Sequence, residues 1–215
     1  MSKALWTCLI WGLLLSVNCP ATARPAPKTK GTMDLKITLR VYDYAGVQAG
    51  LLGRALDHAR EIFGDTGIAV ARIICTNDES PAVCNQAPDP LNIALRIVPK
   101  PVPGADYGTL GYASGQYITV NYSRVKEFAD QSRVVLDRIL ACVVAHELGH
   151  VLLGPNSHSA AGIMTACLTD KELRLIRVMF IGFLPFQQER LRDFVLFQQR
   201  QTRNLGAGSI AFARQ

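Results

Sequence analysis

The chain has 215 residues, of which 49% are hydrophobic and 19% are charged, so one folded domain is expected and wholesale disorder is excluded. Its formal net charge of +6 is spread along the sequence rather than gathered in a patch, and no RNP-like, zinc-finger or basic-helix pattern is present. These features argue against a nucleic-acid-binding protein.

The N-terminus is typical of a secretory signal peptide. Lys3 supplies a short positive region, Ala4 to Val17 is a mostly apolar run, and Ala21-Thr22-Ala23 is a small-x-small cleavage pattern. The apolar run is shorter than the about 20 residues that a membrane-spanning helix needs, which favours cleavage near Ala23 over an uncleaved anchor. We therefore expect a signal peptide over 1–23 and a secreted protein, extracellular or periplasmic, whose mature form has no membrane segment.

Strand-like and helix-like segments alternate after the leader. Residues 24–33 are rich in Pro and Lys and predict a solvated lead-in, and we place the folded domain at 34–200. From Asp34 the sequence alternates between an apolar and a polar face, which predicts a half-buried strand. The apolar face consists of Leu35, Ile37, Leu39 and Val41, and the polar face consists of Lys36, Thr38 and Arg40.

The next segments predict one helix and three more strands. Apolar residues at helical spacing from Val47 to Phe63 predict a helix that Gly64 and Gly67 end. Strands are predicted over 68–74, 91–98 and 116–120, and the prolines and glycines of 99–115 predict a long irregular loop.

The second half of the domain is predicted to be mainly helical. A long helix over 132–153 is ended by Gly154-Pro155, a short helix begins at Asp170 with Thr169 as its cap, and an amphipathic helix covers 186–200. Residues 201–215 are expected to be a flexible tail. This order of elements predicts a single α/β (α+β) domain in which helices pack on a mixed sheet.

The segment His146-Glu147-Leu148-Gly149-His150 carries the chemistry. Residues at i and i+4 share one face of a helix, so the two imidazoles converge on one metal ion. A catalytic zinc takes three protein ligands and a water whose pKa it lowers, and Glu147 is placed to act as general base on that water. The apolar flanks predict a buried helix, on which two histidines and a glutamate are costly unless they are partnered.

The residues after this helix offer a third ligand. Gly154 breaks the helix and lets the chain turn back, which brings His158 toward the metal. Ser159 follows it, and Gly162-Ile163-Met164 comes shortly after. In these residues the sequence resembles the metzincin clan of zinc peptidases, and within it the matrixin-like members.

The resemblance implies a fold and a set of roles. It implies one catalytic zinc held by His146, His150 and His158, Glu147 as the base, and Met164 in a methionine turn beneath the metal. It also implies a mixed twisted N-terminal sheet with two main helices, followed by a small, mostly helical C-terminal subdomain. In this clan a sheet-edge strand binds extended substrate, and 116–120 is the expected counterpart.

The sequence departs from the clan in the loop that leads to His158. Gly154 is four residues after His150 and His158 is four residues further on, so the loop is two residues longer than the usual pattern and contains a proline. Loops accept such insertions at small cost in free energy. The alternative third ligand is Glu172 on the following helix, as in thermolysin-like peptidases.

Four cysteines remain after the leader, and in an exported protein disulfides are the default expectation. Sequence proximity favours Cys75–Cys84, and Cys142–Cys167 then follows by elimination. The second bond would join the methionine turn to the histidine-bearing helix.

Two functions fit these observations. The first is a secreted zinc endopeptidase acting on protein or peptide substrates. The second is a secreted zinc-binding pseudo-peptidase that acts by recognition, since the loop is altered and no tyrosine shortly after Met164 could stabilise an oxyanion. The retained Glu147 favours the enzyme, because a zinc-binding module has no need of a carboxylate there. Nothing in the sequence indicates assembly, so a monomer is assumed.

Overall fold

The computed structural model describes residues 34–76, 80–101 and 108–212, with side chains up to residue 204. These residues belong to one compact unit that begins at Met33. The expected signal peptide over 1–23 and the lead-in over 24–33 lie outside the described residues.

A mixed five-stranded sheet forms the centre of this unit, in the order β2-β1-β3-β5-β4. Strands β2, β1, β3 and β5 run parallel to one another, and β4 is antiparallel to β5 at one edge. In the register of β1, Leu39 lies opposite Arg72 of β2 and Ile93 of β3. The strands are β1 (Lys36–Asp43), β2 (Ala69–Ile74), β3 (Asn92–Val98), β4 (Gly111–Ser114) and β5 (Tyr117–Asn121).

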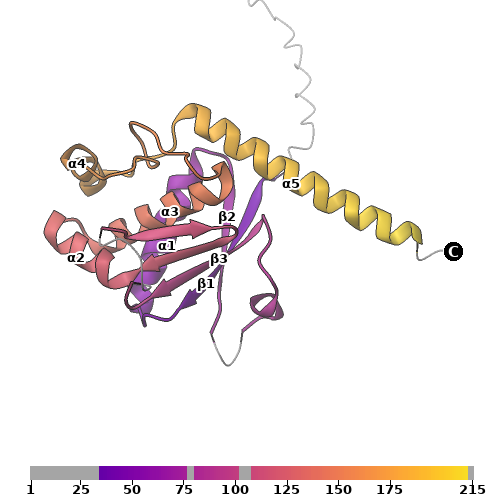
Figure 1. Ribbon diagram of the computed structural model, residues 1–215, viewed down its shortest axis with the longest axis horizontal. Helices are drawn as coiled ribbons and strands as arrows, with labels where there is room; N and C mark the ends of the chain where they lie inside the picture. Colours follow the sequence, from indigo (N-terminus) through magenta and orange to yellow (C-terminus); the bar gives the residue numbers. More distant parts are fainter. Residues whose placement is uncertain (1–33, 77–79, 102–107, 213–215) are drawn as a thin grey trace, which may run out of the picture. The chain divides into compact units, whose positions relative to one another are not determined.

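Five α-helices and one short 3-10 helix accompany the sheet in the described part of the chain. The helices are α1 (Ala49–Gly64), the 3-10 helix η1 (Ala82–Asn85), α2 (Tyr122–Ser132), α3 (Leu136–Leu153), α4 (Asp170–Val178) and α5 (Pro185–Phe212). Figure 1 shows α1 and α3 packed on one face of the sheet. The mixed α/β fold expected from the sequence is therefore present.

The core lies between the sheet and the pair α1–α3. The predicted apolar face of β1 points into it, with Ile37, Leu39 and Val41 all at most 2% exposed. Alternation in β1 and helical spacing in α1 thus produce two apolar surfaces that cover each other. Helix α3 is buried on most of its circumference, as its apolar flanks predicted, and this burial holds its polar residues in fixed positions.

Three predicted boundaries were wrong. The loop expected over 99–115 contains β4, which forms a tight hairpin with β5 through Gly115 (φ +56°). The sheet edge is therefore β4, and the strand predicted as the edge is covered by β3 and β4 on its two sides. Helix α2 precedes α3 and is separated from it by Arg133 in a left-handed conformation. Helix α5 begins at Pro185 and continues through the expected tail to Phe212.

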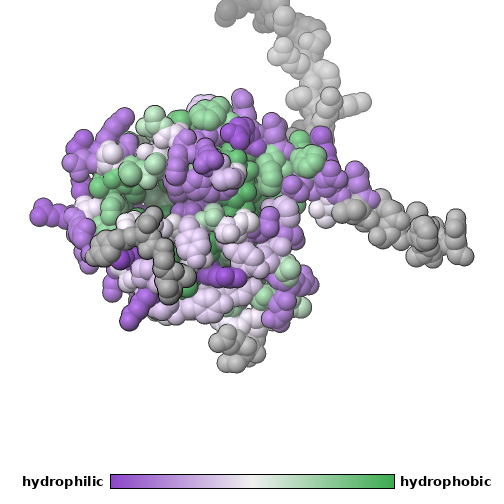
Figure 2. Space-filling view, viewed as in Figure 1, coloured by the Kyte–Doolittle hydropathy of each residue, from purple (hydrophilic) through white to green (hydrophobic). Residues whose placement is uncertain are grey.

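The visible surface is mainly polar. On the face shown in Figure 2, hydrophilic side chains cover most of the described surface and hydrophobic side chains occur in small groups. None of the helices in the described ranges is both long and apolar enough to cross a membrane.

Candidate metal centre

Helix α3 carries the first two histidines of the site. His146 and His150 project from the same face one turn apart, with ring centroids 4.7 Å apart and Nε2 atoms 3.0 Å apart. The helix positions them accurately because the surrounding residues, including Leu148 and Ala145, are 1% exposed or less.

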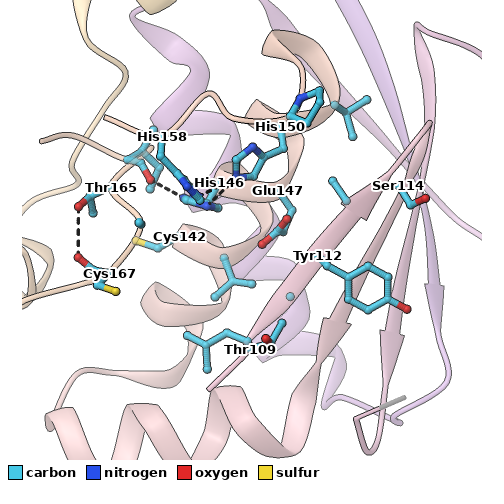
Figure 3. Close-up of a pocket in the computed structure, with 18 of the residues that line it drawn as sticks. Thr109, Tyr112, Ser114, Cys142, His146, Glu147, His150, His158, Thr165 and Cys167 are labelled. Atoms are coloured by element: carbon cyan, nitrogen blue, oxygen red, sulfur yellow. Dashed lines mark hydrogen bonds between the residues drawn. The ribbon is translucent and has the colours of Figure 1, made fainter. Parts of the chain in front are cut away.

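The loop after α3 brings His158 to the same point. Gly154 ends the helix at φ +92° and Asn156 adopts φ +61°, so the chain reverses direction. As a result His158 Nε2 lies 3.0 Å from His150 Nε2, and the ligand atoms of the three histidines are all within 4.8 Å of one another. Figure 3 shows the three rings converging beside Glu147. The two-residue insertion therefore does not keep His158 from the cluster.

Hydrogen bonds orient two of the three rings. The Nδ1 of His146 is 2.8 Å from the carbonyl oxygen of Ile163, which can only accept, so Nδ1 carries the proton and Nε2 presents a lone pair to the cluster. The Nδ1 of His150 is 3.0 Å from the hydroxyl of Ser157. Such partners on the remote nitrogen fix both the tautomer and the direction of a metal-ligating imidazole.

The protonation of the cluster is set mainly by burial. The pKa of His146 is lowered to about 4, mainly by burial and to a smaller extent by the neighbouring rings of His150 and His158, against the hydrogen bond to Ile163 that raises it. Burial also lowers the pKa of His150, with a contribution from His158. At neutral pH both rings are uncharged, and converging nitrogen lone pairs without a cation between them would repel. Three neutral imidazoles are a donor set that fits Zn²⁺, with a coordination position left for water.

Glu147 lies between the histidines and the edge strand. Its side chain is buried, and burial raises its pKa to about 7. Strand β4 passes very close, because a Cβ placed on Gly111 would lie 3.1 Å from Glu147 Cγ and 3.0 Å from Val143 Cγ1. Glycine at position 111 thus permits the edge strand to pack directly against the carboxylate-bearing side chain.

The histidines and Glu147 open into a cavity of about 870 Å³. One wall is β4 with the residues just before it, and the opposite wall is the segment from Gly154 to Leu168. The cavity also reaches Phe128 of α2 and Val143 of α3. An extended chain lying along β4 would pass in front of the three histidines.

Met164 lies beneath the cluster in a turn. It is fully buried, and a Cβ on Gly149 would collide with its sulfur, so the thioether packs against the backbone of α3 between His146 and His150. The turn depends on Gly162 at φ +80° and on a hydrogen bond from Ile163 N to Gly182 O at 2.9 Å. Met164 is thus buried against the helix that carries His146 and His150, and its assignment to a methionine turn stays a prediction.

The structure does not bring Glu172 to the histidines. Its carboxylate accepts hydrogen bonds from the backbone N–H and the hydroxyl of Thr169, and the Thr169 hydroxyl accepts from Lys171 N. This is a capping box at the start of α4. Glu172 therefore caps the start of α4 rather than completing the cluster.

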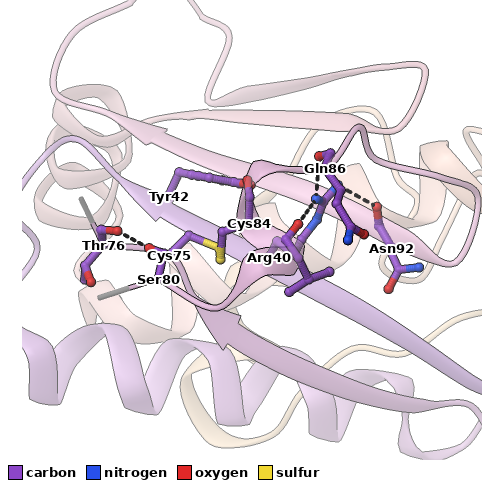
Figure 4. The surroundings of a disulfide bond; sticks show 9 residues. Arg40, Tyr42, Cys75, Thr76, Ser80, Cys84, Gln86 and Asn92 are labelled. Carbon is purple, nitrogen blue, oxygen red and sulfur yellow. Dashed lines mark hydrogen bonds between the residues drawn. A yellow bond between two sulfur atoms is a disulfide. The ribbon is translucent and has the colours of Figure 1, made fainter. Parts of the chain in front are cut away.

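The first predicted disulfide, Cys75–Cys84, is formed (Figure 4). It closes a loop that covers Arg40, which was predicted to lie on the polar face of β1 but is fully buried. The Arg40 guanidinium donates to the carbonyl oxygens of Val83 (2.5 Å) and Gln86 (2.7 Å), and Tyr42 donates to that of Cys84 (2.6 Å). Backbone carbonyls thus take the place of a carboxylate partner for this buried cation.

The second predicted disulfide, Cys142–Cys167, is not formed, and both thiols are free. Cys142 is packed inside α3 at 2% exposure, whereas Cys167 is an exposed residue of the loop after the methionine turn. The prediction rested on pairing by elimination, which fails when two cysteines stay unpaired. The turn is held to α3 by Met164 and by the bond between His146 and Ile163 instead.

Ser157 and Gln187 are site residues that the sequence did not reveal. Gln187 of α5 is 1% exposed and bonds to the loop that carries His158. No local pattern identifies such a residue, because its contact spans 28 positions of the chain.

Comparison with known proteins supports the fold. No protein-family model and no curated protein matches the sequence. Among solved structures, archaemetzincin from Methanopyrus kandleri is similar over 77% of this chain and 98% of its own, with 16% identity and a TM-score of 0.50. This chain therefore has a mixed α/β fold like that of archaemetzincin.

Proposed function

We propose that this protein is a zinc-dependent peptidase that hydrolyses peptide bonds in protein or peptide substrates, with one zinc held by His146, His150 and His158. The observation that carries the proposal is the convergence of three imidazole nitrogens beside a buried glutamate in one open cavity. The likeness to archaemetzincin supports the fold on which this site is built. We also propose that the protein is related to the matrixin-like peptidases, because Ser159 follows His158 and Met164 comes shortly after.

A zinc ion held by His146, His150 and His158 would act as a Lewis acid, which would acidify a water molecule and polarise the scissile carbonyl group. Glu147 takes the proton of the attacking water and passes it to the leaving amine. Burial raises the pKa of Glu147 to about 7, which strengthens it as a base. The positive charge of a zinc ion bound by the three histidines would lower the pKa of Glu147.

Strand β4 orients the substrate. Within the described ranges it has a strand neighbour on one side, so the backbone groups along its other edge are available to pair with an extended peptide. Pairing there would bring the scissile bond in front of Glu147, whose side chain packs against Gly111. We further propose that the protein acts outside the cytoplasm after cleavage near Ala23, as the leader over 1–23 predicts.

The test is cleavage of an unfolded protein substrate by the zinc-loaded protein and by its Glu147→Ala variant. Loss of the general base should lower kcat about 10²–10⁴-fold while one zinc stays bound, and a chelator should abolish the wild-type activity. Zinc binding without cleavage of varied substrates would refute the peptidase proposal and favour the pseudo-peptidase that acts by recognition.

A matched pair of variants identifies the third ligand. His158→Ala should lose most of the zinc affinity, whereas Glu172→Gln should keep it, because Glu172 is occupied at the start of α4. The reverse result in equilibrium dialysis would show that the ligand set proposed here is wrong.

A further inference from the structure

The loop from Gly154 to Ser159 is the irregular part of the candidate metal centre. It contains two residues with positive φ, Gly154 and Asn156, and delivers a His158 that is exposed rather than buried. An exposed loop of this kind loses conformational entropy when its histidine is fixed on a metal. A contact that fixes the loop beforehand would therefore strengthen metal binding.

Gln187, at the beginning of α5, makes such a contact. Its Nε2 donates to Ser159 Oγ at 3.1 Å and lies 3.5 Å from the carbonyl oxygen of Ser157. Its Oε1 accepts from Leu184 N at 3.0 Å, so both ends of the buried amide are engaged. The amide thereby links α5 to the residues on either side of His158.

The two serines pass this constraint on to the cluster. Ser157 Oγ lies 3.0 Å from His150 Nδ1, and Ser159 N donates to Met164 O at 2.9 Å. One side of the loop is thus tied to a second ligand histidine and the other side to the methionine turn. Ser159 Oγ also donates to Ala161 O at 2.8 Å, which leaves its lone pairs for the Gln187 amide.

We propose that Gln187 is a positioning residue of the metal centre, which holds the lengthened loop so that His158 meets His146 and His150 before the ion binds. The inference rests on the proposed zinc site and adds to it a residue from the C-terminal helix. It also explains how a loop with two additional residues still places its histidine at the cluster: a buried amide bridges the loop from outside.

The test compares Gln187→Met with Gln188→Met. The side chains have similar volume, and Gln188 lies on the same helix but donates to Phe183 O and not to the loop. Removing a partner bonded directly to a ligand histidine typically costs about 10–100-fold in metal affinity. Gln187 bonds to the loop rather than to a histidine, so we expect a loss at the lower end, about 10-fold, for Gln187→Met in a zinc competition titration. Gln188→Met should bind zinc as the wild type does.

Spectroscopy and thermal unfolding separate positioning from general stability. In the cobalt-substituted protein, Gln187→Met should alter the visible d–d bands, which report the ligand geometry, while Gln188→Met should leave them unchanged. Ser159→Ala removes the acceptor of the same hydrogen bond and should reproduce the loss of affinity, which keeps the test valid if Gln187→Met does not fold. Combined with Gln187→Met it should add little further loss, because both changes break the hydrogen bond between Gln187 and Ser159 that joins α5 to the loop.

The outcomes are distinct. Unchanged zinc affinity and cobalt spectra in Gln187→Met and Ser159→Ala, with a lower Tm of the metal-free protein, would overturn the inference and leave Gln187 a purely structural residue. A wild-type protein that binds no stoichiometric zinc would overturn both the proposed function and this inference.

Discussion

Two irregular segments of this protein are held in place by opposite means. The described residues from Ser80 to Leu91 are joined to Cys75 by the Cys75–Cys84 disulfide, and the carbonyl oxygens of Val83 and Gln86 in this segment accept hydrogen bonds from the guanidinium of Arg40. The segment from Gly154 to Thr169 has no covalent closure, and single hydrogen bonds and the packing of Met164 hold it. In the first, the cross-link is part of the chain, whereas in the second a bound metal would be the cross-link. The comparison indicates that the protein keeps permanent closure away from the proposed chemistry.

The largest effect is expected when the buried cation of the first segment is removed. Arg40→Met should lower the free energy of unfolding by about 4 kcal/mol, because two short hydrogen bonds from a charged donor are lost and buried carbonyl oxygens are left unpaired. Urea denaturation measures it, and zinc affinity should not change. Arg96→Met is the control, since Arg96 is exposed and its guanidinium lies over the ring of Tyr117 rather than on buried carbonyl oxygens.

Removal of the disulfide should have a slightly smaller effect. In the double variant Cys75→Ala/Cys84→Ala the free energy of unfolding should fall by about 3 kcal/mol. The disulfide closes a short loop and lowers the conformational entropy of the unfolded chain, and this constraint is lost in the variant. Urea denaturation of oxidised protein provides the measurement. A large fall in zinc affinity in the same variant would contradict the separation of the two segments.

A change beneath the metal should affect stability and metal binding together. Gly149→Ala places a methyl group against the sulfur of Met164 and 3.0 Å from Phe183 Cε1, which should cost about 2 kcal/mol and weaken zinc binding. Gly53→Ala is the control, and its effect on the free energy of unfolding should have the opposite sign. Position 53 lies in α1 with open space around it, so alanine should raise the free energy of unfolding by about 0.5–1 kcal/mol. Equal effects of the two variants would show that Met164 does not pack as described.

The smallest effect concerns reactivity rather than stability. In the folded protein a thiol reagent should label Cys167 and leave Cys142 unmodified, because Cys142 is inaccessible and burial raises the pKa of its thiol to about 12. Mass spectrometric mapping of the labelled peptides distinguishes the two. After unfolding without reductant both thiols should react with the reagent. If neither reacts, Cys142 and Cys167 are joined by the disulfide predicted from the sequence.

The sequence predicted those parts of the molecule whose physics is local. The apolar face of β1, the buried α3 and the i, i+4 pair of histidines follow from periodicity and spacing alone. The close pair Cys75–Cys84 was predicted correctly from proximity, and the fold class from the order of the elements.

What the sequence did not predict depends on contacts between distant segments. Strand β4 is four residues long and has no apolar alternation, so only its pairing with β5 makes it a strand. Arg40 is buried because η1 folds over it, which its position on the polar face of β1 could not indicate. Gln187 meets the loop only after α5 has packed. Each of these features is set by tertiary structure rather than by local propensity.

The contact between α5 and the loop has a consequence for the order of events during synthesis. The ribosome releases α3 and the His158 loop before it makes α5. A chain grown only as far as Leu184 contains all three histidines and Glu147, but the amide that holds the loop is still missing. Capture of zinc at full affinity by the proposed site would then wait until the last helix has been made.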